Sequence, residues 1–358
     1  MKSFNKFLSK NPLVFLLLSL PLTLAAQLLQ WSSVAIFILA AIGIIPLAAY
    51  IGEATEDLAS YTGPRWGALL NATLGNAAEL IITITAVQAG LLGLVLASIT
   101  GSIIGNLLLV LGFSLVVGGI RHGTQTFNKV NASRNAILLV LAVVTLIIPS
   151  MFSQSIVGKA ADSKVEALSI GVAIIMIALY ILGLFDASRS KESALSHTTP
   201  KSELPDWTLA QAIAILALAT IGVVYLSESL VRVAEDVIAS LGISEFFLGI
   251  IFVPLIGNVA EHLVAVQMAH KNKMDLSVEI AISSSLQIAL FVAPLLVFIS
   301  LALGNPMHLI FNQFELLALM AAVVISALVS YDGESTWLEG AGLLSIYMIL
   351  GLAFFLLP

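Results

Sequence analysis

Two glutamates stand in the same five-residue setting, one in each half of a chain of 358 residues. Glu79 closes the segment Gly75–Glu79, which reads GNAAE, and Glu261 closes Gly257–Glu261, which reads GNVAE and lies 182 residues further on. Both segments interrupt apolar runs. A carboxylate at the centre of a membrane costs roughly 2.5–3.5 kcal/mol on insertion scales, so each glutamate is a candidate functional residue. The repetition predicts one site built from two copies of a motif.

Each glutamate has an asparagine three positions before it, which places the two side chains on one face of a helix. The pairs are Asn76 with Glu79 and Asn258 with Glu261. The glycine that opens each copy permits close approach or a break in the helix. Pro254 favours a break in the second copy, and the first copy has no equivalent proline. A broken helix exposes carbonyl groups, which a membrane tolerates only where they line a cavity.

Small hydroxyl residues and one amide follow each copy. Asn106 comes 27 positions after Glu79, and Gln287 comes 26 positions after Glu261. The hydroxyl residues that are candidate ligands are Ser102 and Ser284. An alternative role for these side chains is helix packing and hydrogen bonding between helices, which is common in membranes.

An acidic pair also repeats upstream of each motif. Glu56 and Asp57 correspond to Glu235 and Asp236, and a glycine follows each pair at the same interval. Glu56 and Glu235 are candidates for a gate or a proton path. The alternatives for them are a solvated helix end or an ion pair with Arg65 or Arg232, and for Asp57 and Asp236 solvation is preferred.

Two carboxylates with amide and carbonyl oxygens form a hard-oxygen site. Ca²⁺ takes six to eight oxygen ligands at about 2.3–2.6 Å, and two glutamates balance its charge. The chain has no cysteine, and His262 is the histidine beside a motif; this argues against Zn²⁺ or Cu⁺, while Mn²⁺ stays an alternative. Without the cation, facing glutamates repel and favour protons on the same oxygens. Mutually exclusive occupancy by cation and protons is the simplest basis for antiport.

Composition sets the class of protein. Hydrophobic residues make up 59% of the chain, charged residues 10%, and the mean hydropathy is +1.06. Soluble domains carry about 25% charged residues. The sequence therefore predicts an integral, multi-pass membrane protein. It carries no basic patch for nucleic acid and no motif that calls for a cofactor, and a homo-oligomer is compatible with it.

Apolar runs predict an all-α polytopic protein of eleven transmembrane helices. Residues 1–32 hold an N-terminal tail and the first helix; a cleaved signal peptide is the alternative there. Two five-helix repeats follow, 33–187 and 207–358, and 188–206 is a polar linker. The ten repeat helices are expected near 33–62, 66–89, 93–119, 133–152, 165–186, 208–240, 244–269, 275–303, 312–330 and 336–357.

An odd number of helices per repeat requires that the two repeats insert with opposite orientation, as in many secondary transporters. With the N-terminus cytoplasmic, twelve of the 15 Lys and Arg residues fall on the cytoplasmic side. This bias follows the positive-inside rule. It predicts a cytoplasmic linker and an external C-terminus, and the compact chain fits a prokaryotic inner membrane.

Several segments resemble the Ca²⁺/H⁺ exchanger family, the cation exchanger branch of the Ca²⁺/cation antiporter superfamily. The resemblance runs from about Gly43 to Leu357. It is carried by both Gly-Asn-x-x-Glu segments and by four further stretches: GSIIGN at Gly101–Asn106, Glu261 with His262, SSSLQIALFVAP at Ser283–Pro294, and DGESTWLEG at Asp332–Gly340.

The resemblance implies an inverted repeat, alternating access, and export of Ca²⁺ against a proton gradient without a cofactor. It implies central ligands and polar neighbours at Glu79, Glu261, Asn76, Asn258, Asn106 and Gln287, and it suggests that Glu56 and Glu235 lie on gating helices. His262 is a candidate proton relay or a packing residue. Ser283 departs from an expected glycine, and Glu279 is an extra carboxylate whose role stays open.

Rival functions fall in the same and in other classes. A Na⁺/Ca²⁺ or Mn²⁺/H⁺ exchanger of the same fold is the nearest alternative, although ligands for several Na⁺ are sparse. A channel or a passive cation-sensing protein is a second alternative. An enzyme is disfavoured because no nucleophile and base are paired in the sequence. The expected partners are Ca²⁺, H⁺ and the lipid bilayer.

Overall fold

The computed structural model describes residues 12–189 except 156–160, then residue 205 and residues 207–357. Most of the predicted linker and the N-terminal lysines therefore lie outside the described residues. The described chain is helical nearly throughout, as its long apolar runs predict. Inside a membrane, helices satisfy their own backbone hydrogen bonds, which favours this architecture for apolar segments.

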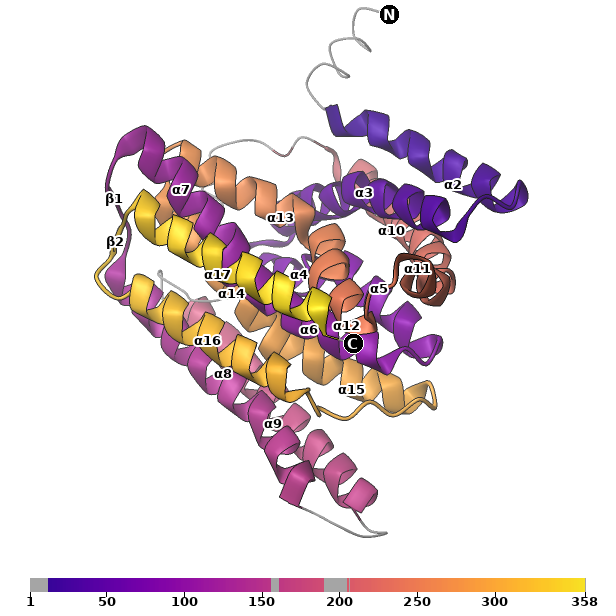
Figure 1. Ribbon diagram of the computed structural model, residues 1–358. Coiled ribbons are helices and arrows are strands. Elements are labelled where there is room, and N and C mark those ends of the chain that lie inside the picture. Colours follow the sequence, from indigo (N-terminus) through magenta and orange to yellow (C-terminus); the bar gives the residue numbers. More distant parts are fainter. Residues whose placement is uncertain (1–11, 156–160, 190–204, 206, 358) are drawn as a thin grey trace, which may run out of the picture.

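The first half of the chain forms a series of helices joined by short turns (Figure 1). They are η1 (Pro12–Leu18), α2 (Ser19–Leu28), α3 (Ser33–Thr62), α4 (Pro64–Leu74), α5 (Ala77–Gln88), α6 (Leu92–Ile104), η2 (Gly105–Val110), α7 (Leu111–His122), α8 (Lys129–Ser155) and α9 (Ala161–Arg189). The segment η2 is a π-helical turn that continues α6 into α7.

The second half repeats this order. Its helices are α10 (Leu209–Arg232), α11 (Ala234–Leu241), α12 (Glu245–Phe247), η3 (Leu248–Phe252), α13 (Val253–His270), α14 (Met274–Gln287), η4 (Ile288–Val292), α15 (Ala293–Ala302), α16 (Gln313–Val329) and α17 (Trp337–Leu356). Both η3 and η4 are π-helical turns.

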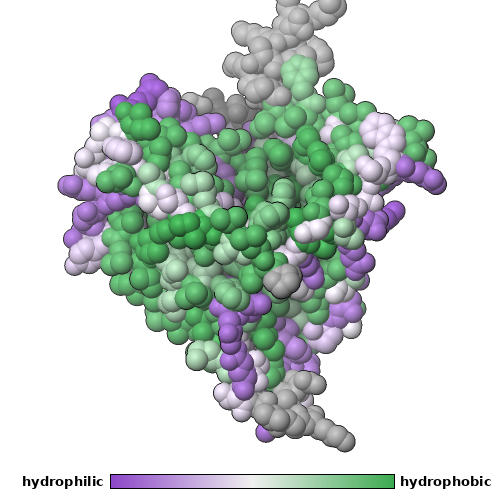
Figure 2. All heavy atoms as spheres, viewed as in Figure 1, coloured by the Kyte–Doolittle hydropathy of each residue, from purple (hydrophilic) through white to green (hydrophobic). Residues whose placement is uncertain are grey.

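Within the described residues, eight helices are long and apolar enough to cross a membrane. Three shorter apolar helices accompany them, at Leu13–Leu28, Ala77–Gln88 and Gln313–Val329. Large apolar side chains cover the outside: Leu218 is 69% exposed and Leu356 is 70% exposed. Figure 2 shows this hydrophobic surface across the middle of the molecule, with hydrophilic residues gathered towards its edges. The prediction of a multi-pass helical membrane protein is confirmed.

The break in the repeated motif lies in the copy where the sequence did not predict it. In the first copy the helix stops after Leu74 and resumes at Ala77, because Asn76 leaves helical geometry at φ −94° and ψ 15°. In the second copy α13 runs unbroken through Gly257. Pro254 directly follows the π-helical turn η3, inside a helical stretch that continues from Glu245 to His270. A proline removes one backbone hydrogen bond of a helix, and a π-helical turn lets the helix continue at such a point. The expectation that Pro254 breaks the helix at the second copy was therefore wrong: the irregularity is a π-helical turn before the motif.

Two pairs of helices hold the halves together. α10 packs along α3, and α17 packs along α7. A two-residue ribbon adds a link at the edge where α7 ends (Figure 1): β1 (Gln125–Thr126) pairs antiparallel with β2 (Glu334–Ser335). Both links join residues of the first half to residues of the second.

A close crossing of backbones connects α6 with η3. A Cβ built on Gly101 would lie 2.1 Å from the backbone oxygen of Ile250, and one on Gly249 would lie 2.5 Å from Cβ of Ala97. Only glycine permits such an approach. The counterpart of η3 in the first half is α4, which packs on α3 rather than closely on α14.

Candidate cation-binding site

The two copies of the motif face each other in the structure. A Cβ built on Gly257 would lie 3.6 Å from Cα and Cβ of Glu79. In return, a Cβ built on Gly75 would lie 3.7 Å from Oε1 of Glu261. Each glycine therefore packs beside the glutamate of the other copy. This reciprocal contact brings the two glutamates to one place between the halves, as the repetition in the sequence predicts.

Glu79 is 1% exposed and lies in the first turn of α5. Its Oε1 accepts a hydrogen bond from Oγ of Ser102. The same Ser102 oxygen accepts from Nδ2 of Asn258 at 3.3 Å. Ser102 thus connects the glutamate of one half to the asparagine of the other.

Glu261 has the equivalent serine as its partner. Oγ of Ser284 donates to Oε2 of Glu261 at 2.7 Å. Both serines follow their glutamates by 23 positions, so the repeat holds in three dimensions. Glu261 is only partly buried, whereas Glu79 is enclosed.

Amide side chains link the halves at two further points. Nδ2 of Asn76 donates to Oε1 of Gln287 at 2.7 Å. Nε2 of His262 lies 3.1 Å from Oδ1 of Asn106. Asn106 therefore pairs with His262, and Gln287 pairs with Asn76. These two contacts are not equivalent in the two halves, unlike the two serine–glutamate bonds.

Two oxygens of the site stay without a hydrogen-bond partner among the described residues: Oε2 of Glu79 and Oδ1 of Asn76. Buried polar atoms are paired in the great majority of cases, so each exception calls for an explanation. Carboxylate and amide oxygens are the ligands that hard divalent cations prefer. The described residues hold no group of three or more His, Cys, Asp and Glu able to bind a metal.

One cavity of about 590 Å³ reaches this site. Glu261, Gly75 and Gly257 line it, and α3 contributes residues from Pro46 to Glu56. Glu56 therefore lines the approach to the site. Glu235 is exposed on α11 and is not among the residues that line this cavity. The structure brings Glu56, but not Glu235, to the approach.

Comparison with known proteins places the chain in a family. The family described as sodium/calcium exchanger protein matches residues 32–186 and 211–356, which together make up most of the chain. This chain belongs to the sodium/calcium exchanger protein family. The resemblance to exchangers drawn from the repeated motifs is thereby confirmed.

Bacterial relatives of this exchanger-family chain carry more specific names. It is 46% identical to the Ca(2+)/H(+) antiporter ChaA of Bacillus subtilis, over 97% of this chain and 100% of that protein. It is 44% identical to the Ca(2+)/H(+) antiporter of Aphanothece halophytica, over 98% of each.

Solved structures agree. Native YfkE superimposes with a TM-score of 0.85 at 44% identity, covering 96% of this chain and 100% of that one. The H+/Ca2+ exchanger CAX superimposes with a TM-score of 0.73 at 14% identity, covering 97% and 92%, and so shows the shared fold alone. A nearly all-helical exchanger fold is therefore established for this family member.

One polar contact of this family member differs from the sequence-based expectation. Asp57 is only 9% exposed, and its Oδ2 accepts a hydrogen bond from the backbone N–H of Trp207 at 2.8 Å. The hydroxyl of Tyr61 donates to the backbone oxygen of Trp207 at 2.9 Å. These bonds tie α3 to the chain just before α10. Solvation was expected for Asp57, because the sequence does not show which distant backbone group will face it.

Proposed function

We propose that this protein is a secondary active antiporter that exports Ca²⁺ from the cytoplasm in exchange for H⁺ by alternating access. The observation that carries this proposal is the reciprocal packing of the two motifs, in which each glycine lies beside the other copy's glutamate. It gives one site with two carboxylates, reached by one cavity. The names and the extent of similarity of the bacterial relatives support the choice of ions.

Glu79 and Glu261 are the central ligands in this proposal. Two carboxylates balance one divalent cation, and Asn76 adds an amide oxygen that lacks a partner among the described residues. Asn258, Asn106, Gln287, Ser102 and Ser284 complete the polar surroundings. The serines donate to the glutamates, which holds the carboxylates in place with or without the cation.

Exchange follows from competition for the same oxygens. When Ca²⁺ leaves, two negative charges remain close together in a site of low polarity. Like charges and burial both favour the neutral form of a carboxylate, so protons take the place of the cation. Ca²⁺ arriving from the cytoplasm displaces those protons. No step needs a nucleotide or a cofactor.

The topology is part of the proposal. Eleven membrane-spanning helices, one plus two inverted repeats of five, put the N-terminus and the β1–β2 ribbon on the cytoplasmic side of a bacterial inner membrane. The cavity extends along α13 from Glu261 to Gln267, towards the end where Gln125 bonds to Asn272. The site then faces the cytoplasm, and the crossing of Gly101 with Ile250 closes the external side.

Glu56 and His262 have secondary roles in this scheme. Glu56 lines the cavity and attracts cations to its approach. His262 touches Asn106 and serves as a proton relay or as a packing residue. Glu235, by the inversion of the repeats, is placed for the external passage.

Calcium uptake by proteoliposomes with an imposed pH gradient tests the proposal. We expect Glu79→Gln and Glu261→Gln each to abolish proton-driven ⁴⁵Ca²⁺ flux, because each removes half of the balancing charge. Glu334→Gln is the matched control, since Glu334 is exposed in β2. A Na⁺ gradient without a pH gradient should drive no flux. Wild-type flux in either glutamate variant, or flux that needs no counter-ion, contradicts the proposal.

A further inference from the structure

The helix α6 begins without a capping side chain of its own. Its N-cap residue, Leu91, makes no side-chain hydrogen bond to the helix. By contrast α10, α16 and α17 begin at Thr208, Asn312 and Thr336, whose side chains accept from the backbone of their own first turns. The first N–H groups of a helix have no acceptor within it. The start of α6 therefore depends on an acceptor from elsewhere in the chain.

Glu245 supplies that acceptor from the other half of the molecule. It is the first residue of α12, and its Oε1 accepts a hydrogen bond from the backbone N–H of Leu94 at 2.7 Å. A negative group is also favourable at the positive end of a helix dipole. Gly93 makes the space: a Cβ there would lie 3.0 Å from Oε1 and 3.2 Å from Oε2 of Glu245. The carboxylate therefore lies directly on the first turn of α6.

This bond continues the close crossing of α6 with η3. From α12 the chain passes into η3, where Gly249 meets Ala97 and Ile250 meets Gly101. Leu94, Ala97 and Gly101 are spaced by three and four residues, so they share one face of α6. In the proposed cycle this crossing closes the external side. The site can then open to that side only if α12 and η3 separate from α6.

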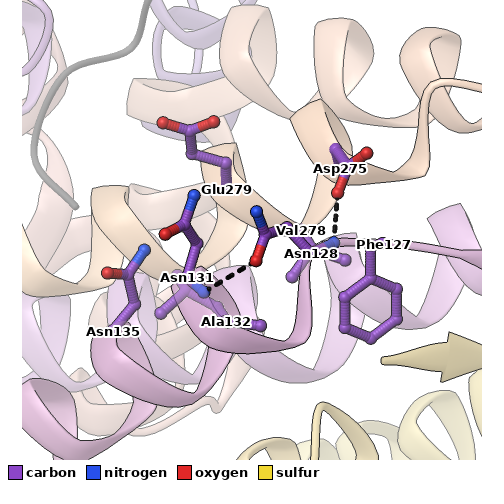
Figure 3. Close-up of a pocket in the computed structure, with 9 residues that line it drawn as sticks. Phe127, Asn128, Asn131, Ala132, Asn135, Asp275, Val278 and Glu279 are labelled. Carbon is purple, nitrogen blue, oxygen red and sulfur yellow. Dashed lines mark hydrogen bonds between the residues drawn. The ribbon is translucent and has the colours of Figure 1, made fainter. Parts of the chain in front are cut away.

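The second half differs at the equivalent place. The residue 182 positions after Gly93 is Asp275, at the start of α14. Its carboxylate accepts a hydrogen bond from the backbone N–H of Asn128, drawn as a dashed line in Figure 3. A crevice of about 170 Å³ lies beside this part of α14. The helix α4, which corresponds to η3, contains no Asp or Glu. The sequence therefore provides a capping carboxylate for α6 and none from α4 for α14.

We propose that Glu245 is a gating residue, which holds α12 and η3 on α6 while the site faces the cytoplasm and lets go when the site opens to the outside. The proposal rests on the alternating access proposed above. Once α12 moves away, water takes over as the partner of both the carboxylate and the N–H of Leu94. A contact made in one state only favours that state. Loss of the Glu245 bond should therefore shift the population towards the outward-facing state.

Cysteine labelling tests this shift. The chain has no cysteine, so one introduced thiol reports the exposure of α6. Ser98 is suitable because it is 1% exposed, its hydroxyl has no partner among the described residues, and it lies four residues after Leu94. In purified Ser98→Cys protein, we expect Glu245→Ala to speed labelling by a water-soluble maleimide roughly fivefold or more. Glu228→Gln, at an exposed carboxylate of α10, should leave the rate unchanged.

Gly93→Ala tests the same contact from the α6 side. Its methyl group displaces the carboxylate, while alanine itself favours a helix over glycine. We expect this substitution to speed labelling of Ser98→Cys and to add nothing once Glu245→Ala is present, because both remove one contact. Equal labelling with and without Glu245→Ala overturns the proposal. An independent, additive effect of Gly93→Ala overturns it as well.

A second reporter separates opening of the crossing from general loosening of the fold. Val143 lies on α8 and is 0% exposed, so Val143→Cys should be labelled slowly with or without Glu245→Ala. Equal acceleration at Val143→Cys and Ser98→Cys overturns the gating role. No ion flux enters these measurements. Failure of the gating role therefore leaves the antiport proposal intact, and absence of proton-driven Ca²⁺ flux would not by itself change the labelling result.

Discussion

Gly101 touches the backbone of Ile250 so closely that a Cβ on Gly101 would lie 2.1 Å from the Ile250 oxygen. The residue 182 positions after Gly101 is Ser283, which bonds its hydroxyl to the backbone oxygen of Glu279 at 2.5 Å. Glycine therefore stands where α6 closely crosses η3, and serine stands on α14, whose Ile280 lines the cavity. The smaller residue of the equivalent pair is thus at the position where two backbones touch, and the larger one is on the helix that lines the cavity.

Substitution of Gly101 should disrupt the closed crossing. We expect Gly101→Ala to lower the free energy of unfolding by about 1–3 kcal/mol, which is typical of overpacking, because a backbone oxygen cannot swing aside as a flexible side chain does. Thermal unfolding in detergent measures the change, and proton-driven flux should fall with it. Gly171→Ala is the control, since a Cβ there meets nothing within 4 Å. Equal melting temperatures for the two variants would show that the crossing can relax.

The two serines of the site should differ in importance. Ser102 donates to Glu79 and accepts from Asn258, whereas Ser284 makes a single bond to the partly exposed Glu261. Hydrogen bonds to charged groups contribute about 1.5–3 kcal/mol. We expect Ser102→Ala to weaken Ca²⁺ binding roughly tenfold or more, and Ser284→Ala to weaken it less. Isothermal titration of the purified protein compares them, and the reverse order would argue against the network through Ser102.

Asp57 should anchor α3 rather than bind the transported ion. We expect Asp57→Ala to destabilise the fold by about 1–2 kcal/mol, because the partly buried N–H of Trp207 loses its acceptor. Asp57→Asn retains an acceptor oxygen and should recover part of the loss. Thermal unfolding reports the difference, and Ca²⁺ affinity should stay near that of the wild type. A loss of affinity equal in both variants, without a change in stability, would place Asp57 in the cation path instead.

Much of the fold could be predicted because apolar length and polar interruptions are local properties. The helix expected at 33–62 is α3, with the same bounds, and the helix expected at 312–330 is α16 within one residue at each end. The meeting of Glu79 and Glu261 followed from the repetition, since duplicated halves tend to place equivalent residues about one axis. None of these inferences needs knowledge of a distant neighbour.

What the sequence did not reveal depends on such neighbours. The break at Asn76 is not marked by proline, whereas Pro254 is accompanied by a π-helical turn in a helix that continues through it. The span expected at 208–240 is divided near Val233, where φ is −99° and ψ is 1°. Asn106 bonds to His262, whereas Gln287 accepts from Asn76. These partners depend on the relative orientation of the two halves, which spacing along the chain does not specify.

The hydrogen bonds around Gln125 and Trp207 divide the ribbon end of the molecule into two groups. Gln125 pairs with Ser335 in the ribbon and donates to Asn272 at 2.7 Å, which laces three loops together. Trp207 is fastened to Asp57 and Tyr61, which laces α3 to the entry of α10. Among the residues that the structure describes, these two sets of bonds share no member, so the ribbon and the α3–α10 pair are fastened separately.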